Sequence, residues 1–167
     1  PAPIMLSGNT DCYQPAERKF RITRQLLEVA LKFRNPVGLI TKNKLILRDL
    51  DLLKQLAELN LVHVMISITS LDEELRLNME PRTATAKNRL EVVRTLNTNG
   101  IPTGVMVAPI IPGLNSHEIP DIIEAAANAG ALKAGMTMVR LNGDIGEIFT
   151  NWIRKAYPDK AEKVLNK

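Results

Sequence analysis

Five runs of polar residues could take part in binding or chemistry, because each follows directly on an apolar stretch of the sequence. Their hydroxyl, amide and charged groups suit a ligand that carries carboxylate, ribose or phosphate groups. The runs are Ser7, Asn9 and Asp11; Thr41, Lys42 and Asn43; Ser67, Thr69 and Ser70; residues 109–115; and Arg140, Leu141 and Asn142. The first run taken alone is better explained as a helix-capping loop, because its residue types are common in turns.

Acid and base candidates are scarce among these runs. The sequence has no Ser-His-Asp arrangement, phosphate-binding P-loop or GxGxxG fingerprint. His63 lies inside an apolar run and His117 near an expected helix start, and neither has metal-ligand spacing. We therefore assign no catalytic residue and no metal ligand, and expect difficult chemistry to come from a cofactor.

The elements that position these runs follow from apolar periodicity. Strands are expected near residues 3–7, 37–41, 62–69, 103–110 and 134–141, and amphipathic helices over 16–34, 49–59, 72–78, 85–99, 117–129 and, with a break at Pro158, 144–167. This alternation predicts an α/β domain with a parallel sheet over residues 1–167. Periodicity alone does not separate an open doubly wound sheet from an arc of a barrel.

In a parallel sheet the carboxyl ends of the strands share one edge, so the five polar runs should meet there. The sequence therefore predicts a polar rim above an apolar core, a common place for a ligand. Two explanations stay open for Lys42, and two for Glu80 with Arg82. Lys42 is either a ligand contact or a solvated lysine, and Glu80 with Arg82 is either near the ligand or an ordinary surface pair.

Composition narrows the class of protein. A chain of 167 residues, 45% hydrophobic, can bury one core, and its single cysteine excludes an internal disulfide, a structural zinc set and a complete iron–sulfur ligand set. The net charge of +4 is spread along the chain, and only Arg18, Lys19, Arg21 and Arg24 cluster, which favours a solvated helix face. No run resembles a membrane span or an export signal, so a cytoplasmic location is expected.

A family resemblance appears when the polar runs are taken in order. The segments are SGNTDCYQPAERK, TKN, SIT, SLDEELRLNMEPRTATAKNRLEVVRTLNTNGI and VMVAPIIPGLN. Together they resemble the radical S-adenosylmethionine (radical SAM) superfamily over residues 4–145, most closely its spore photoproduct lyase-related branch. The molybdenum-cofactor biosynthesis cyclases share the wider pattern.

The resemblance implies a parallel-stranded partial (β/α)6 TIM-like barrel with helices outside. It also implies S-adenosylmethionine (SAM) and a 4Fe-4S cluster at the carboxyl mouth. There the cluster reduces SAM to a 5′-deoxyadenosyl radical, which abstracts hydrogen from a substrate. Flavodoxin or ferredoxin is the kind of electron donor implied, and the substrate stays unknown.

The resemblance also implies roles for individual residues. Ser7, Asn9 and Asp11 occupy the place that faces the SAM amino group, and Lys42 the place that meets its carboxylate. Ser67 and Thr69 fall at a ribose or carboxylate position. The strand containing Pro109 matches the segment that packs on adenine, and the strand ending at Arg140 matches one whose backbone contacts the base.

The sequence departs from the family at the cluster. It contains no C-x3-C-x2-C loop, which in the family follows the first strand. Cys12 follows the strand that corresponds to the second, so we interpret Cys12 as a small residue packed at a helix start. The five strands correspond to the second to sixth of the family, with the first strand missing. Because the chain starts at Pro1 without Met, we expect a fragment, inactive alone, of a parent protein that carries the cluster.

Two alternatives differ in class. One is a cluster-free barrel lyase or aldolase in which Lys42 forms a Schiff base. The other is a non-catalytic scaffold that binds a nucleotide. Nucleic acid is not indicated as a partner, since aromatic residues make up only 4% of the chain. An unpaired edge strand would also favour dimerisation or aggregation.

Overall fold

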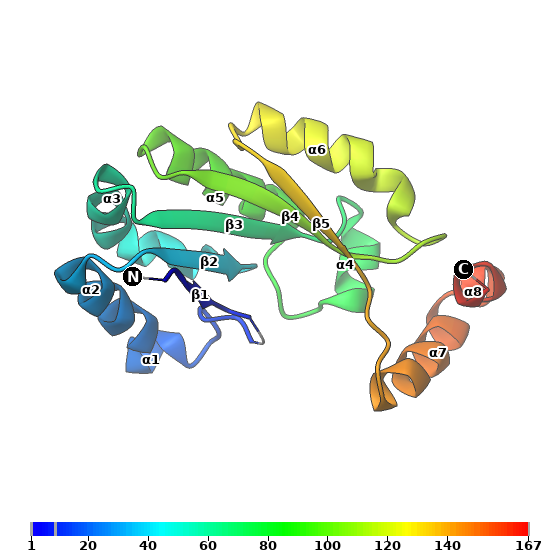
Figure 1. The fold of residues 1–167 in the computed structure, drawn as a ribbon. Helices are drawn as coiled ribbons and strands as arrows, with labels where there is room; N and C mark the ends of the chain where they lie inside the picture. The colour runs from blue at the N-terminus through cyan, green and yellow to red at the C-terminus, as the bar shows by residue number, and fades with distance from the viewer. Residues whose placement is uncertain (1, 9, 167) are drawn as a thin grey trace.

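The chain forms one five-stranded parallel sheet. The structure is a computed structural model and describes residues 2–8 and 10–166. Its strands are β1 (Ile4–Leu6), β2 (Val37–Thr41), β3 (Val62–Ile68), β4 (Thr103–Ile110) and β5 (Ala134–Met138). Strand order in the sheet follows chain order, and every neighbouring pair is parallel. The sheet bends into a half-barrel, as the family resemblance implies (Figure 1).

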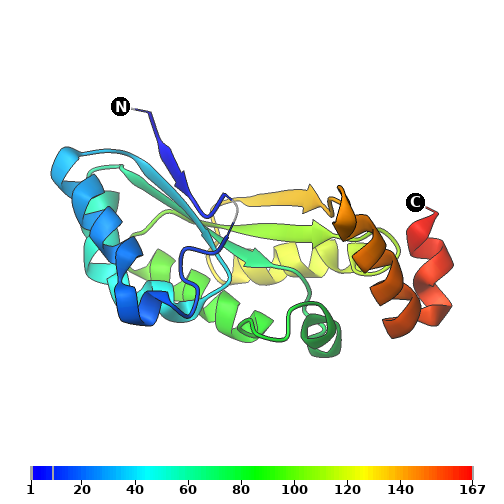
Figure 2. The ribbon, with the colours of Figure 1, turned by 90° about the horizontal axis from the view of Figure 1, so that it is seen from below.

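Helices cover the convex face of the sheet and leave the concave face bare (Figure 2). The helices of the described part are α1 (Glu17–Phe20), α2 (Ile22–Phe33), α3 (Leu50–Glu58), α4 (Glu73–Met79), α5 (Ala86–Thr98), α6 (Ile119–Asn128), α7 (Asp144–Ala156) and α8 (Pro158–Leu165), with 3-10 turns η1 (Lys44–Asp49) and η2 (Ser116–Glu118). The α7–α8 hairpin lies off the convex face, beyond the carboxyl ends of the strands (Figure 1). No helix in the described part of the chain has the length and apolar character needed to span a membrane.

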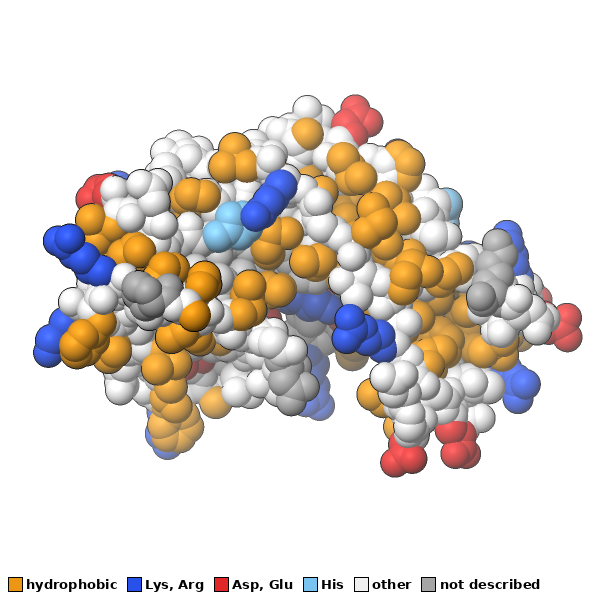
Figure 3. All heavy atoms as spheres, viewed as in Figure 1, with side chains coloured by type: hydrophobic (Ala, Val, Ile, Leu, Met, Phe, Trp, Pro, Cys, Tyr) orange, Lys and Arg blue, Asp and Glu red, His pale blue; other side chains and the backbone are white. Residues whose placement is uncertain are grey.

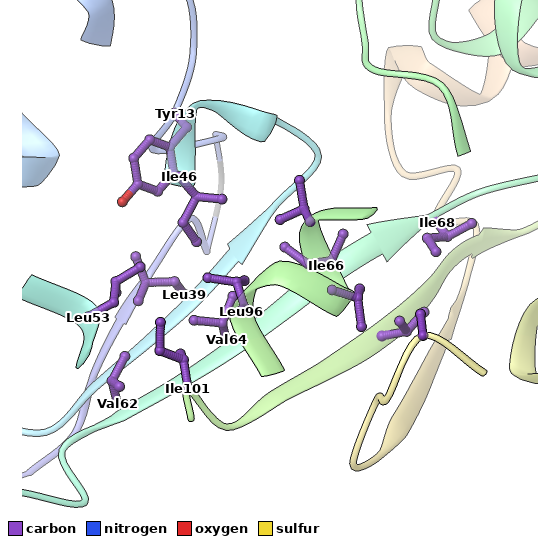
Figure 4. Close-up of a cluster of buried hydrophobic side chains, with 14 of the residues drawn as sticks. Tyr13, Leu39, Ile46, Leu53, Val62, Val64, Ile66, Ile68, Leu96 and Ile101 are labelled. Carbon is purple, nitrogen blue, oxygen red and sulfur yellow. The ribbon is translucent and has the colours of Figure 1, made fainter. Parts of the chain in front are cut away.

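The main core lies between the sheet and these helices. Alternate strand residues point toward the helices, so Leu39, Val64 and Ile66 pack against Leu53 of α3 and Leu96 of α5 (Figure 4). A second, smaller cluster joins the α7–α8 hairpin to the rest: Leu75, Ile111, Leu114, Ile153, Ala161 and Val164.

The predicted strands are confirmed, with small differences at their ends. The strands expected at 3–7, 62–69 and 134–141 end earlier in the structure, at Leu6, Ile68 and Met138. Their last residues leave the sheet hydrogen-bonding pattern and enter the loops. Three of the polar runs therefore begin at the last one or two residues of their strands, at Thr41, Ser67 and Pro109, and the other two begin one or two residues beyond them.

The prediction of one uninterrupted helix over residues 16–34 is wrong. Arg21 adopts a left-handed conformation (φ 52°) and separates α1 from α2. The Glu17 carboxylate accepts a hydrogen bond from the Thr23 amide at 3.1 Å, and the Thr23 hydroxyl donates to the Cys12 carbonyl at 2.6 Å. These contacts satisfy an amide at the start of α2, which makes the break stable.

The basic cluster beside this break is only partly a solvated face. Arg24 forms ion pairs with the buried carboxylate of Asp49, at 3.2 Å, and with exposed Asp51, at 2.7 Å. Arg48 and the Tyr13 hydroxyl also bond Asp49. Asp49 therefore joins α2 to α3 and is more than the simple helix start expected from the sequence.

Candidate functional site

Three of the predicted site residues lie on one face at neighbouring strand ends. In β2 and β3, Ile40 is paired with Met65, and both side chains belong to the concave face. Because side chains alternate along a strand, Ser67 lies on that same face near the end of β3, and Lys42 and Thr69 continue it into the loops. The structure therefore brings together a cation and two hydroxyl groups that the sequence separates by more than twenty residues.

Glu80 connects these side chains. One carboxylate oxygen, Oε1, accepts from Lys42 Nζ and, at 2.8 Å, from the Thr69 hydroxyl. The other, Oε2, accepts from Arg89 Nη2 at 2.7 Å and from the Thr83 hydroxyl at 3.3 Å. We call Lys42, Thr69, Glu80 and Arg89 the charged cluster.

Burial sets the electrostatics of the charged cluster. The Glu80 side chain is 9% exposed and that of Arg89 is 2% exposed, whereas Lys42 keeps 29% exposure. Burial alone would raise the pKa of Glu80, but the charges and hydrogen bonds of Lys42 and Arg89 outweigh burial, so this pKa is lowered. Glu80 is thus a carboxylate at neutral pH, and Lys42 is its partly solvated partner.

The loop that carries Glu80 is fixed by two buried arginines. Arg76 donates to the Glu80 carbonyl at 3.0 Å and to the Thr83 carbonyl at 2.9 Å. Arg89 donates to the Ala84 carbonyl at 2.8 Å and, from Nη1, to the Ser67 carbonyl at 2.9 Å. The loop is therefore bonded both to α4 and to the end of β3.

The predicted residues after β1 are tied to their own loop. Ser7, in a left-handed conformation (φ 73°), accepts from the Cys12 amide at 2.8 Å. Asp11 accepts from the Thr41 hydroxyl at 2.8 Å and from the amides of Lys42 and Tyr13 at 2.9 and 2.8 Å. Asp11 thereby holds this loop to the end of β2. Asn9 lies outside the described residues.

A cleft of about 460 Å³ opens beside Lys42. Its lining includes the basic side chains of Arg18, Lys42, Lys44 and Arg82 and the single acidic side chain of Asp11. Figure 3 shows basic side chains in the hollow between the sheet and α7. The excess of positive charge favours a ligand with an anionic group.

The end of β4 is hydrogen-bonded to the end of β3. Ala108 precedes a cis peptide bond to Pro109, and its carbonyl accepts from the hydroxyls of Ser67 and Thr69 at 3.2 and 3.0 Å. Buried Asn115 donates to the Pro109 carbonyl at 3.0 Å and to that of Thr69 at 2.9 Å. These bonds fix β4 against β3 at the point where the sheet ends.

An apolar cleft of about 280 Å³ lies beyond Pro109. It is lined mainly by side chains from the ends of β4 and β5 and from α7: Pro109, Ile111, Val139, Ile145, Phe149 and Trp152. Arg140 follows Val139 and is exposed, and none of the hydrogen bonds or ion pairs among the described residues includes it. The structure does not bring Arg140 into the charged cluster.

The described residues do not fit an iron–sulfur cluster. None of their His, Cys, Asp and Glu side chains form a group of three that could share a metal ion. Cys12 packs against the core, and burial raises the pKa of its thiol to about 11, with the Asp11 charge adding to the effect against the Ser7 hydrogen bond. A thiol of that kind is a poor source of the thiolate that iron binds.

The sequence did not single out Glu80 and Arg89 as partners. The interpretation of Glu80 and Arg82 as a surface pair is wrong, because Glu80 is nearly buried and pairs with Lys42 and Arg89. A signal for Arg89 exists, since it shares helical spacing with the buried residues Val92, Val93 and Leu96 of α5. A charged residue on the core face of a helix requires a buried partner.

Known protein families and individual proteins resemble this chain in sequence. The sequence profile of the Radical SAM superfamily matches residues 3–126. An uncharacterized protein of Mycobacterium tuberculosis is 29% identical over 158 residues, covering 93% of this chain and 46% of that protein. Another, of Methanocaldococcus jannaschii, is 29% identical over 167 residues, covering 98% of this chain and 60% of that protein. The chain thus spans about half the length of these relatives.

Solved structures share the fold. A variant of spore photoproduct lyase, with bound SAM and a dinucleoside spore photoproduct, superposes with a TM-score of 0.66 at 18% identity, covering 95% of this chain and 46% of that one. SuiB of Streptococcus suis bound to SAM superposes with a TM-score of 0.59 at 13% identity, covering 92% and 35%. At these identities the likeness concerns the fold alone.

Proposed function

Because this chain belongs to the radical SAM superfamily, we propose that its half-barrel binds SAM in a radical SAM enzyme, with Lys42 meeting the methionine carboxylate. The observation that carries the proposal is the position of Lys42, a cation at a strand end beside a positively charged cleft. In this family SAM is the source of a 5′-deoxyadenosyl radical that takes hydrogen from the substrate. The residues of this chain bind and orient SAM.

Other parts of the ligand find suitable groups nearby. The Ser67 hydroxyl donates to the Ala108 carbonyl, and the single hydrogen of the Thr69 hydroxyl is shared between Ala108 and Glu80, so both hydroxyl oxygens keep lone pairs that can accept from a ribose hydroxyl. The apolar cleft between Pro109 and Val139 suits the adenine ring. The carboxylate of Asp11 and the hydroxyl of Ser7 are the acceptors proposed for the amino group, together with Asn9.

Several wider features are proposals for the whole protein. They are the 4Fe-4S cluster, a flavodoxin or ferredoxin donor, and a cytoplasmic location. Because Cys12 does not fit as a cluster ligand, we assign no residue of this chain to iron. The spore photoproduct bound to the structural neighbour belongs to that protein, so the substrate proposed here is unspecified beyond a molecule with an abstractable hydrogen.

The Schiff-base alternative is disfavoured by the charged cluster. A Schiff base needs an amine nitrogen that is free to attack a carbonyl carbon, whereas Lys42 Nζ is held in an ion pair with the Glu80 carboxylate. The nucleotide-binding scaffold shares the same site and differs only in having no redox activity. Reduction and cleavage of SAM by the reconstituted protein would decide against the scaffold.

A binding measurement tests the role of Lys42. Lys42→Met should weaken SAM binding by about tenfold or more, the scale of one charge-assisted hydrogen bond, in isothermal titration calorimetry. Lys44→Met is the matched control, because Lys44 lines the same cleft but is exposed and lies outside the charged cluster. Wild-type affinity in Lys42→Met would refute the proposed contact.

A further inference from the structure

We propose that Glu80 is a positioning residue for the cofactor: it fixes the Lys42 ammonium at the strand ends so that this ammonium meets the ligand carboxylate. The inference rests on the proposed function, in which Lys42 binds that carboxylate. Glu80 lies outside the five polar runs at the strand ends. Its proposed role affects the affinity for ligands that carry a carboxylate and leaves the affinity for other ligands unchanged.

The first step of the argument is the mobility of lysine. A lysine side chain has four flexible carbon–carbon bonds and carries its charge as a compact ammonium, so an unrestrained Lys42 would spread over many positions. The contact with Glu80 Oε1 selects one of these positions, beside Thr69 at the end of β3. A ligand then meets an ammonium that is already in place.

The second step is the rigidity of Glu80 itself. Both carboxylate oxygens have partners on other elements, Thr69 after β3 and Arg89 on α5. Its backbone is also held, because the Glu80 amide donates to the Arg76 carbonyl at 2.6 Å while Arg76 bonds the Glu80 carbonyl. Glu80 is therefore a fixed point to which the more mobile Lys42 is attached.

The third step is that Lys42 keeps capacity for a ligand. An ammonium has three N–H donors, and among the hydrogen bonds of the described residues its Nζ contacts only Glu80. The side chain also keeps 29% exposure and lines the cleft. The ion pair thus orients Lys42 and leaves donors for the two oxygens of a carboxylate.

An opposite role for Glu80 makes a different prediction. If Glu80 competed with the ligand for Lys42, removing its charge would tighten binding. If Glu80 only stabilised the fold, its loss would weaken all ligands alike. Decarboxylated SAM separates these cases, because it keeps the adenosine and the sulfonium and lacks the carboxylate.

The experiment measures the affinities of SAM and decarboxylated SAM by calorimetry for the purified protein and its variants. Glu80→Gln keeps the size of the side chain and removes its charge. We expect it to weaken SAM binding by about fivefold to tenfold, the scale of a charge-assisted hydrogen bond, and to leave decarboxylated SAM unchanged. In a Lys42→Met background, Glu80→Gln should cause no further loss.

Two further variants keep the test decisive. Glu80→Asp retains the charge but places it one methylene farther from Lys42, so this variant replaces Glu80→Gln if Glu80→Gln fails to fold. Its loss of binding affinity should again be confined to SAM. Glu74→Gln removes an exposed carboxylate of the neighbouring helix α4 that takes part in none of the ion pairs among the described residues, and it should change neither affinity.

The outcomes separate the two proposals. Three results would overturn the positioning role of Glu80 and leave the proposed function intact. They are tighter SAM binding in Glu80→Gln, equal losses of affinity for both ligands in Glu80→Gln, and full SAM affinity in Glu80→Gln alongside a loss in Lys42→Met. Full SAM affinity in Lys42→Met would instead overturn the proposed function, and the Glu80 inference with it.

Discussion

Glu80 and His63 are titratable residues whose pKa values are lowered for different reasons. For Glu80 the charges of Lys42 and Arg89 outweigh burial, which alone would raise the pKa. For His63, on β3, burial itself lowers the pKa because it disfavours the charged ring, and the charge of Lys133 adds to the effect. A lowered pKa therefore stabilises a charge in one residue and neutrality in the other.

His63 makes stability depend on pH. Its folded pKa lies below the unfolded value of about 6.5, so the unfolded chain binds more protons as the pH falls. The stability of the fold with a neutral His63 is therefore fully present above the unfolded pKa of His63, and part of it is lost as the pH falls below that value. Between pH 7.5 and 5.5 we expect a loss of about 0.5 kcal/mol, kept small because solvent screens a half-buried ring.

Chemical denaturation of two variants checks the His63 prediction. His63→Leu should lose this part of the pH dependence, and its stability at pH 7.5 should hold because the His63 Nε2 atom is buried without a hydrogen-bond partner among the described residues. His117→Gln, at an exposed position, should keep the wild-type dependence. The same pH dependence in both variants would contradict the prediction.

Sequence reasoning at the residue scale succeeded where strand periodicity applies. Lys42, Ser67 and Thr69 could be placed together because parallel strands share an edge and side chains alternate. Glu80 could not, because the loop between α4 and α5 has no period and its path is set by the arginine contacts of Arg76 and Arg89. The ligand roles of Lys42, Ser67 and Thr69 stay predictions.

At the scale of elements, the concave face of the sheet is built from methionine beside glycine. A Cβ on Gly38 would lie 2.7 Å from the Met5 side chain, and one on Gly104 would lie 2.8 Å from Met65 Sδ. The glycine on one strand thus makes room for the methionine on its neighbour. The expectation that the methionines mainly fill space fits this packing for Met65, which is 7% exposed.

These two glycines should respond differently to alanine. At Gly104 the new Cβ would also lie 2.7 Å from the Lys133 carbonyl oxygen, a backbone atom just before β5 that accepts from the Val105 amide, so we expect Gly104→Ala to cost about 2 kcal/mol. At Gly38 the new Cβ meets only the end of Met5, which is 59% exposed and can move. Gly38→Ala should cost less than about 0.5 kcal/mol.

Urea unfolding of the two alanine variants makes the comparison, with Gly38→Ala as the matched control. Equal losses in the two variants would show that β5 shifts freely and would contradict the assigned cause. Periodicity placed both strands correctly, yet it carries no information on which neighbour approaches a glycine. The break at Arg21 was missed for a similar reason, since a side-chain contact between Glu17 and Thr23 decides it.

At the scale of the molecule, the alternation of strands and helices was sufficient to predict a parallel sheet, and the family resemblance decided between a half-barrel and an open sheet. The sheet has two open edges, at β1 and at β5. The single domain expected over residues 1–167 stays a prediction. Periodicity could not show which helix faces remain uncovered, because an apolar stripe looks the same whether or not another element packs on it.

The edge at β1 carries such an uncovered stripe. On α2 the side chains of Ile22, Leu26, Val29 and Phe33 recur at helical spacing and are 47% to 68% exposed, and Ile4 of β1 is 51% exposed beside them. An open strand edge next to an apolar helix face favours association with another copy of the chain. We therefore expect the 167-residue chain to self-associate as its concentration rises.

Sedimentation velocity over a range of concentrations tests this expectation. Val29→Lys places a charge in the stripe and should weaken self-association by at least about tenfold, because a buried unpaired ammonium is costly. Gln25→Lys adds the same charge to the same helix outside the stripe and should have little effect. Equal weakening in the two variants would assign the effect to net charge, and a wild-type chain that stays monomeric throughout would refute association through this face.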